Sequence, residues 1–323
     1  MAKNAKLRMP KAADVVFSKA DLLKSLAGMD QDKDAVRRVL ELENGFRRKI
    51  DVHLEALRAF DSSFNKLSTN PFVLLIHSKL NSYTRVRQIE GDIIPAKQFS
   101  SMETSAGRMI EEVALPVYGW ETVPSGMHTA YSSIDGRCAK ASKVLKLVTL
   151  KSGPRCLNDE MSQNFADNIL QNADKWAQDA KVSSIDMTYG VLYGTYRISN
   201  KKDWHILRNV YEGAKRPTAS PDGSLSCAFK TNGVNVAVSV RVGLDWWRHL
   251  GGENCFIEVI VALVRACVAP ASYDAKSHDY VVPEIRQIAD TGFIPDNYNV
   301  SVLQRSQLEW LFFIARHFCD RLE

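Results

Sequence analysis

The feature that most constrains the fold is an apolar, β-rich run at residues 144–151 (VLKLVTLK), which ends directly before the residues SGP. Because side chains alternate along a strand, Leu147, Thr149 and Lys151 share one face and the residues between them share the other. Glycine and proline then break the strand. The run therefore predicts a buried strand whose last residue, Lys151, can reach into a cleft at the edge of a sheet.

An aspartate precedes this strand at a distance that suits a hairpin. The segment 128–136 (HTAYSSIDG) predicts a second strand that ends at Asp135, and if the two strands pair, Asp135 lies beside Lys151. A carboxylate there can hold a magnesium ion, and a lysine can position a water molecule or neutralise charge on a phosphate. The pair is a minimum for phosphodiester hydrolysis. A strand-end lysine that reaches toward solvent and a plain Asp-Gly turn are the structural alternatives.

The rest of the pattern alternates helices and strands. Helical spacing of apolar residues covers residues 12 to about 65, and a later helix is expected to end before Pro116. Asn158 is expected to cap a helix with Met161 and Phe165 on its apolar stripe. Further expected elements are strands at 185–198 and 233–242, a helix at 245–250 that stops at Gly251 and Gly252, and helices at 254–268 and 300–319. This alternation predicts an α/β fold with a mixed sheet.

Composition excludes several classes of protein. The chain has 323 residues, 45% hydrophobic and 24% charged, with a net charge of +5, which permits a polyanionic partner without requiring one. Its six cysteines form no CxxC pair, which argues against a zinc site and a disulfide framework and favours reduced thiols. The start of the chain lacks a signal-peptide core, and the apolar stretches are too short to span a bilayer. We therefore expect a soluble, cytoplasmic protein.

A set of short motifs occurs in order along residues 70 to about 268. They are NPF at 70–72, EEVALPVYG at 111–119, SSIDG at 132–136, LKSG at 150–153, GVLYG at 190–194, HILRNVYEGA at 205–214 and GLDWWRHLGGE at 243–253. With these motifs, the spacing of Asp135 and Thr149-Leu150-Lys151 resembles the type II restriction endonucleases of the PD-(D/E)XK superfamily, in particular the enzyme that cuts RGGNCCY. Residues 1–69 carry no such resemblance.

The resemblance implies a fold, an activity and partners. The expected fold is α/β, a restriction-endonuclease-like core with a central mixed β-sheet flanked by helices. The expected domains are an N-terminal helical region at 1–69, which is a candidate for dimerisation, and a catalytic and DNA-recognition domain at 70–323. The implied activity is Mg²⁺-dependent hydrolysis of double-stranded DNA at a short palindromic site by a homodimer within a restriction-modification system. No nucleotide cofactor is expected, since KSGP lacks the glycine spacing of a phosphate-binding loop.

The resemblance also assigns residues, with one departure. It implies that Asp135 and the carbonyl of Leu150 hold the metal and that Lys151 assists the water and the phosphate. Thr149 stands where the family's motif has a second acid, and Ile134 stands where it has proline. A threonine hydroxyl is a poor ligand for the cation, so a carboxylate from elsewhere is expected. Glu112, in the helix before the motif, is the first candidate, and Glu111 is the alternative.

Basic and amide side chains around residues 199–223 are candidates for DNA contact, since such groups bind phosphates and read base edges. The candidates there are Arg208, Asn209, Lys215 and Arg216, and Arg155 and Asn158 follow the catalytic strand. A solvated loop is the alternative reading of this segment.

Two rival functions come from other classes. The threonine at position 149 suits a catalytically weak or inactive DNA-binding protein that kept the nuclease fold. A small-molecule enzyme is the other rival, and it would show no steep salt dependence with DNA.

Overall fold

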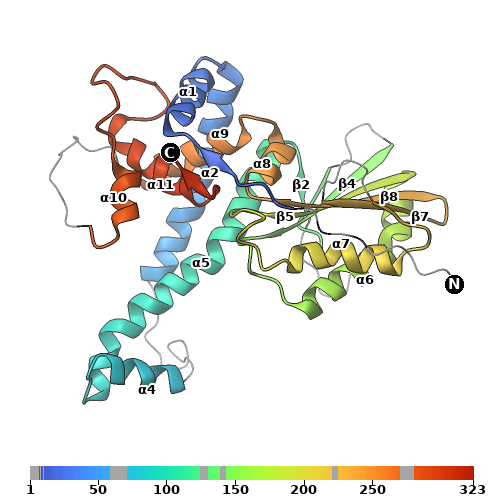
Figure 1. The fold of residues 1–323 in the computed structure, drawn as a ribbon, viewed down its shortest axis with the longest axis horizontal. Helices are drawn as coiled ribbons and strands as arrows, with labels where there is room; N and C mark the ends of the chain where they lie inside the picture. The colour runs from blue at the N-terminus through green and yellow to red at the C-terminus, as the bar shows by residue number, and fades with distance from the viewer. Residues whose placement is uncertain are drawn as a thin grey trace.

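The computed structural model describes residues 7, 9, 11–58, 71–123, 130–138, 143–219, 225–269 and 280–323. The strands of its large sheet lie in one half of the molecule and most of its helices in the other (Figure 1). No helix within these residues has the length and apolar character needed to cross a membrane. The boundary expected at residues 69 and 70 falls outside the described residues and stays a prediction.

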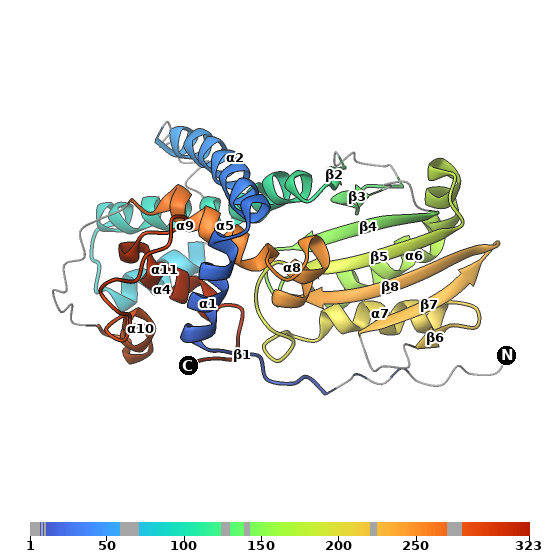
Figure 2. The same ribbon diagram turned by 90° about the horizontal axis from the view of Figure 1, so that it is seen from above.

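Seven strands of the described residues form one mixed sheet in the order β2-β3-β4-β5-β8-β7-β6 (Figure 2). Strands β4, β5 and β8 are parallel neighbours at its centre, and the outer pairs are antiparallel. Their bounds are β2 Glu121–Thr122, β3 Gly136–Cys138, β4 Val144–Lys151, β5 Ser184–Val191, β6 Thr218–Ala219, β7 Ser226–Thr231 and β8 Val234–Val242. The expected α/β fold with a restriction-endonuclease-like mixed sheet is confirmed.

Helices α6 (Asp159–Ala180) and α7 (Lys202–Gly213) cover one face of the sheet (Figure 1). Asn158 caps α6 as expected, since its side chain accepts a hydrogen bond from the N–H of Met161. Both helices bury their apolar stripes against the inner residues of β4, β5 and β8, which form one hydrophobic core. This core packs α6 and α7 against the central strands of the sheet.

A second hydrophobic core lies among the helices and includes residues from both ends of the chain. Helix α5 belongs to this core and runs from the half of the molecule that holds most helices toward β2 and β3 (Figure 2). The helices concerned are α1 Lys19–Asp30, α2 Lys33–Arg58, α5 Glu90–Val117, α8 Leu244–Gly251, α9 Cys255–Cys267, α10 Pro283–Ala289 and α11 Leu308–Arg316, with the 3₁₀ helix η2 Arg305–Gln307. The two-stranded pair β1 (Val16–Phe17) and β9 (Arg321–Leu322) closes the N-terminal segment onto the C-terminal one.

A buried polar cluster fixes the C-terminal end of α5 in this core. The Arg38 guanidinium donates to both carboxylate oxygens of Glu258, at 2.8 and 2.7 Å, and the Tyr118 hydroxyl donates to the same carboxylate at 2.7 Å. The Glu258 side chain is buried, so removal of Arg38 would leave an unpaired charge inside the protein at a cost of about 3–5 kcal/mol. The cluster ties α2, α9 and the end of α5 together.

Several expected elements differ from the structure. Helix α5 continues through Pro116 to Val117, because a proline in the last turn removes only one hydrogen bond, that to the carbonyl of Glu112. Residues 131–133 form a turn, so no strand ends at Asp135; β3 begins directly after it. The strand expected at 185–198 ends at Val191, and the helix expected at 300–319 is shortened to η2 and α11.

Candidate active site

The hairpin of β3 and β4 places Asp135 beside the end of the catalytic strand. Gly136 pairs with Val148, and the N–H of Asp135 donates to the Val148 carbonyl at 2.9 Å. The N–H of Leu150 in turn donates to one carboxylate oxygen of Asp135 at 2.7 Å. The aspartate is thereby held next to the Thr149-Leu150-Lys151 segment, and its second oxygen has no hydrogen bond among the described residues.

Thr149 and Lys151 lie on the face of β4 that turns toward α6. Thr149 is buried, and its hydroxyl donates to the backbone carbonyl of Ser133, two residues before Asp135. Because this hydrogen bond fixes the turn that carries Asp135, the threonine positions the aspartate. Lys151 is half-buried, and its ammonium group has no hydrogen bond or ion pair within the described ranges.

Helix α5 brings a second carboxylate to this edge, and two glycines allow its close approach. A Cβ at Gly107 would lie 3.2 Å from the Ser152 Cβ, and a Cβ at Gly136 would lie 2.9 Å from a methyl group of Leu115. One turn after Gly107, the half-buried Glu111 comes under the electrostatic influence of both Asp135 and Lys151. Its carboxylate forms no hydrogen bond or ion pair with any residue that the structure describes.

The pKa of both carboxyl groups is raised. Burial, and after it the charge of Asp135, raise the pKa of Glu111 to about 7, against the opposing effect of Lys151. Burial also raises the pKa of Asp135, although the Leu150 N–H and Lys151 act to lower it. Two carboxylates that are hard to ionise together form a site that a divalent cation would stabilise.

Glu112 lies next to Glu111 in the sequence but in a different environment. One of its carboxylate oxygens is paired with Lys49 of α2, and the other accepts from Arg108 at 2.9 Å. These cations lower the pKa of Glu112, with the Lys49 hydrogen bond as the largest cause. The structure therefore brings Glu111 to Asp135 and Lys151, and it places the Glu112 carboxylate between two cations.

The donor set suits magnesium better than zinc. Among the described residues there is no group of three or more His, Cys, Asp or Glu side chains that could hold a metal ion. Asp135, Glu111 and the Leu150 carbonyl offer oxygen alone, and Mg²⁺ in proteins is commonly bound by one or two carboxylates while it keeps several waters. The residues present therefore fit a magnesium ion.

A cavity of about 350 Å³ opens in front of Asp135, Thr149 and Lys151. Its other walls come from Ser132 and Ser133 of the preceding turn, from Tyr189 of β5, from Leu157, and from Met161, Asn164, Phe165 and Asn168 of α6. Met161 was expected on the apolar stripe of α6, yet it is 40% exposed at this cavity. The sequence did not predict Asn164 and Asn168 as site residues, because a polar residue on an amphipathic helix normally faces solvent.

Comparison with known proteins decides the family. The family model described as "Type II restriction endonuclease EcoO109I" matches residues 54–215, which is half of the chain and includes Glu111, Asp135 and Lys151. The chain belongs to this family. It is a type II site-specific deoxyribonuclease that acts on double-stranded DNA. No curated protein matches the chain significantly.

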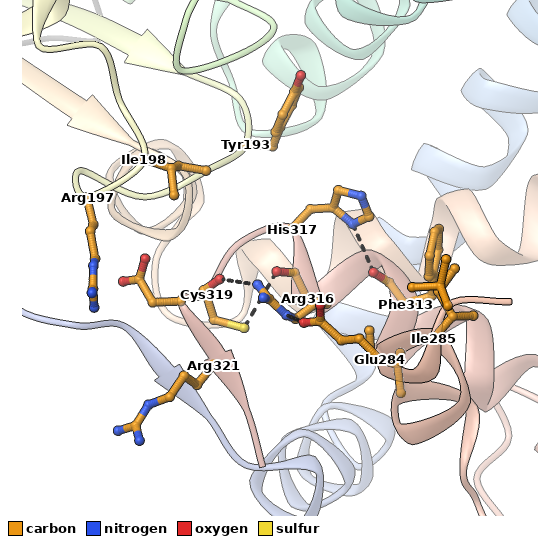
Figure 3. Close-up of a pocket in the computed structure, with 13 residues that line it drawn as sticks. Tyr193, Arg197, Ile198, Glu284, Ile285, Phe313, Arg316, His317, Cys319 and Arg321 are labelled. Atoms are coloured by element: carbon orange, nitrogen blue, oxygen red, sulfur yellow. Dashed lines mark hydrogen bonds and ion pairs between the residues drawn. The ribbon is translucent and has the colours of Figure 1, made fainter. Parts of the chain in front are cut away.

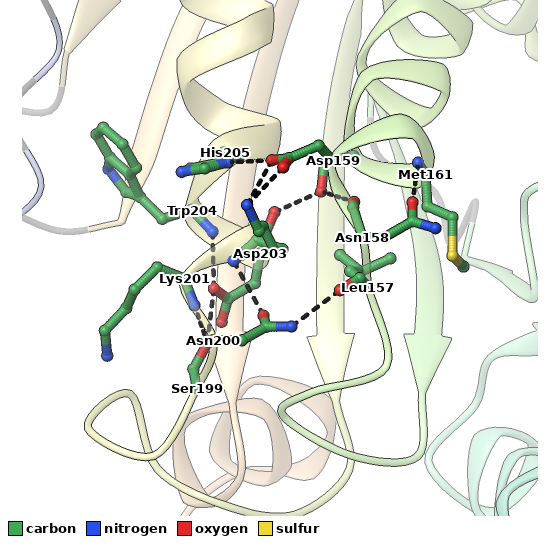
Figure 4. A network of polar contacts seen from close by, with 12 residues as sticks. Leu157, Asn158, Asp159, Met161, Ser199, Asn200, Lys201, Asp203, Trp204 and His205 are labelled. Carbon is green, nitrogen blue, oxygen red and sulfur yellow. Dashed lines mark hydrogen bonds and ion pairs between the residues drawn. The ribbon is translucent and has the colours of Figure 1, made fainter.

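Two of the endonuclease's candidate DNA contacts lie beside the catalytic strand. Arg155 donates to the Ile198 carbonyl at 3.2 Å, and the Asn158 side chain serves as the cap of α6. Figure 4 shows how the loop before α7 is fastened to this cap: Asn200 donates to the Leu157 carbonyl at 2.9 Å, and Lys202 pairs with Asp159 at 2.6 Å. The loops after β4 and β5 thus form one firm rim next to the site.

The other candidates lie farther along α7. Arg208 stacks over the Trp204 ring at 5.9 Å, and Asn209 is half-buried. Lys215 and Arg216 are exposed after the end of α7, and Arg216 lines a cavity with residues from the starts of β4, β5 and β8. An eight-residue strand such as β4 is about 25 Å long, so Arg216 and Lys151 lie at opposite ends of the sheet. The six residues are not gathered in one place.

A wider cavity, of about 590 Å³, lies between the loop after β5 and helices α10 and α11 (Figure 3). Its charged side chains already have partners: Arg316 pairs with Glu284 at 2.7 Å, and Arg197 pairs with Asp14 at 2.6 Å. The residues that line this cavity do not include two neighbouring carboxylates that are both free of ion pairs, so it offers no metal site like that at Asp135 and Glu111. It adjoins the catalytic edge through Tyr193, whose ring lies against Gly153.

Proposed function

We propose that the endonuclease hydrolyses phosphodiester bonds with Mg²⁺ at the end of β4, with Asp135, Glu111 and the Leu150 carbonyl as ligands. The observation that carries this proposal is the convergence of Asp135, Glu111 and Lys151 at one strand end, where the pKa of both carboxyl groups is raised although Lys151 and, for Glu111, Arg108 act to lower it. A bound Mg²⁺ would polarise the scissile phosphate and lower the pKa of an attacking water. Glu111 replaces Glu112 in this proposal because the Glu112 carboxylate is already paired with two cations.

The chain's own residues have distinct roles in this scheme. The Lys151 ammonium orients the water and offsets negative charge on the phosphate. Asp135 is held in place by the Leu150 N–H, and Thr149 holds the turn before it. The acid that the family's motif carries on the strand is thus supplied from α5.

We also propose that Arg155, Asn158, Arg208, Asn209, Lys215 and Arg216 contact the DNA and that the site is a short palindrome of the interrupted GG/CC type. Arg155 and Asn158 adjoin the catalytic strand, which suits contacts to the backbone near the cut. The family supports a palindrome, since a two-fold enzyme reads a two-fold site. Cleavage of DNA also suits the cytoplasmic location that we propose.

We also propose that the endonuclease is a homodimer, and an exposed apolar surface supports this. Helix α4 (Pro71–Leu80), η1 (Val86–Ile89) and the first part of α5 form an arm that projects from the body (Figure 1). Helix α4 buries none of its residues, and Leu75, Ile76 and Leu80 are 68%, 69% and 79% exposed. Monomeric proteins rarely expose such contiguous apolar surface.

The arm is nevertheless ordered by polar contacts of its own. Asp92 accepts from the Tyr83 hydroxyl at 2.6 Å and from His77 at 2.9 Å, which joins α4 to the start of α5. By contrast, the apolar faces of α1, α2, α9 and α11 are buried against one another within the chain. We therefore propose the arm, in place of the N-terminal or C-terminal helices, as the surface that binds the second copy.

The test is cleavage of a long, sequenced duplex DNA by the purified protein, with Mg²⁺ or with EDTA, followed by mapping of the fragment ends. The proposal predicts discrete fragments only with Mg²⁺ and a palindromic sequence around the cuts. DNA that is bound but never cut would instead favour an inactive DNA-binding protein, for which Thr149 at the acid position is the motivating observation.

A further inference from the structure

The wall of the catalytic cavity formed by α6 carries amide groups that the proposed chemistry does not use. Asn164 and Asn168 are one turn apart and line the cavity opposite Asp135 and Lys151. Between them, the buried Phe165 packs edge-to-face on Tyr189 at 5.6 Å, which anchors this part of α6 on the sheet. The turn of α6 that carries the two asparagines is therefore held in front of β4.

The orientation of Asn168 is set by the same network that positions Asp135. The Ser133 hydroxyl donates to its side-chain oxygen at 2.9 Å, and the Ser133 carbonyl accepts from Thr149. With the amide oxygen occupied, the amide nitrogen is the free end, and it has no acceptor among the residues that the structure describes. The Asn164 side chain likewise has no hydrogen bond with the residues that the structure describes, and it is exposed at the cavity.

We propose that Asn164 and Asn168 bind a phosphodiester next to the scissile one, and this inference rests on the function proposed above. The groups available are neutral donors, which suit the oxygens of a DNA phosphate. A lysine or arginine on this wall would face Asp135 across the cavity and compete with the metal, whereas an amide binds a phosphate without doing so. The exposed Met161 side chain on the same wall offers an apolar contact for the adjoining sugar.

The test compares Asn164→Ala and Asn168→Asp with the wild-type protein, on a duplex that carries the mapped site. Asn168→Asp keeps the oxygen that accepts from Ser133 but replaces the donor by a second oxygen. Asn164→Ala is expected to weaken DNA affinity and raise KM about tenfold or more, with kcat within about threefold, as for loss of a hydrogen bond to a charged group. Asn168→Asp is expected to weaken affinity at least as much, because it also turns a negative charge toward the phosphate. The salt dependence of affinity of Asn164→Ala should match the wild type, because a neutral amide releases no counterion.

The matched control is Gln163→Ala, on the adjacent exposed position of α6, where the Gln163 amide donates to Asp167 at 2.9 Å. It should leave affinity and KM unchanged. Ser133→Ala tests the alternative that Asn168 acts only by holding Ser133. In that case Ser133→Ala reproduces the loss and Asn168→Asp behaves as wild type, which overturns the proposal.

Failure of the proposed catalytic function and failure of the proposed asparagine contacts give different experimental results. If the wild-type protein binds DNA but does not cut it, the proposed catalytic function is wrong, and the affinity comparison still tests the asparagines. If the wild-type protein cuts DNA and both variants, shown to be folded by circular dichroism, keep its KM and affinity, only the present inference is wrong.

Discussion

The two ends of helix α5 lie in opposite environments, although they belong to one continuous helix. All four of its buried residues, Gly107, Val113, Ala114 and Leu115, lie in its C-terminal part, where α2 and the sheet enclose it. Its first turns form the arm, in which Val86 of η1 and Phe99 of α5 are 89% and 62% exposed. The enclosed end holds a half-buried acid at the catalytic edge, while the exposed end presents apolar side chains to solvent.

The difference shows what each end requires. At the enclosed end, burial makes the charge of Glu111 costly in the absence of a nearby cation. At the exposed end, apolar area stays in water until another protein surface covers it. We infer that the catalytic end needs an ion and that the arm needs a second copy.

The largest expected effect is at the enclosed end. Asp135→Asn should lower the cleavage rate by about 10³-fold or more, because stabilisation of the transition-state charge by a metal is worth several kcal/mol. Cleavage of a duplex carrying the mapped site would measure this, with DNA affinity as the check on folding. Wild-type cleavage by a folded Asp135→Asn protein would refute the assignment.

Substitutions of the adjacent residues Glu111 and Glu112 provide the most discriminating comparison. Glu111→Gln should lower the cleavage rate about 100-fold, because it removes a proposed metal ligand without change of shape. Glu112→Gln should stay within about fivefold, since ion pairs this exposed contribute about 0–1 kcal/mol. Both variants are measured under the same Mg²⁺ concentration, and the opposite ranking would restore Glu112 as the second acid.

Substitution in the arm should change assembly and leave the catalytic edge intact. Leu75→Glu with Ile76→Glu should convert a dimer into monomers over micromolar concentrations, because two carboxylates would be buried unpaired in the interface. Light scattering after size exclusion measures the mass. A wild-type protein that is monomeric at every concentration would refute the arm as a dimer interface.

The smallest effect concerns stability of the metal-free protein. Because the pKa of Glu111 is raised to about 7, its ionisation opposes folding as the pH rises from about 4.5 through 7. Glu111→Gln should therefore increase the free energy of unfolding at pH 8 by about 1–3 kcal/mol and change it little at pH 4. Denaturant unfolding in EDTA measures this. An equal change at both pH values would mean that burial of the charge is not the cause.

Much of the sheet and its first helix could be predicted from the sequence, because their signals are local. The apolar run of β4, the alternation of β8 and the cap of α6 at Asn158 all correspond to observed elements. Helix α7 escaped notice, because its basic residues suggest a loop and Lys201 at its start has a left-handed φ of 67° and no side-chain cap. Turn residues at 131–133 were taken for a strand, although Asp135 still reached the expected place through the hairpin.

The choice between Glu111 and Glu112 lay beyond sequence patterns. Adjacent residues on a helix point about 100° apart, and which of them faces the site depends on how α5 packs. That packing comes from contacts distant in sequence, such as Gly107 against Ser152 and Gly136 against Leu115. Neither contact has a signature in either segment alone.

The most direct test of the central claim is Mg²⁺ binding to the metal-free protein by isothermal titration calorimetry, at pH 8 without DNA, for the wild type, Glu111→Gln and Glu112→Gln. The account predicts that Glu111→Gln weakens binding at least tenfold and that Glu112→Gln binds as the wild type does. Weaker binding by Glu112→Gln, together with unchanged binding by Glu111→Gln, would contradict it.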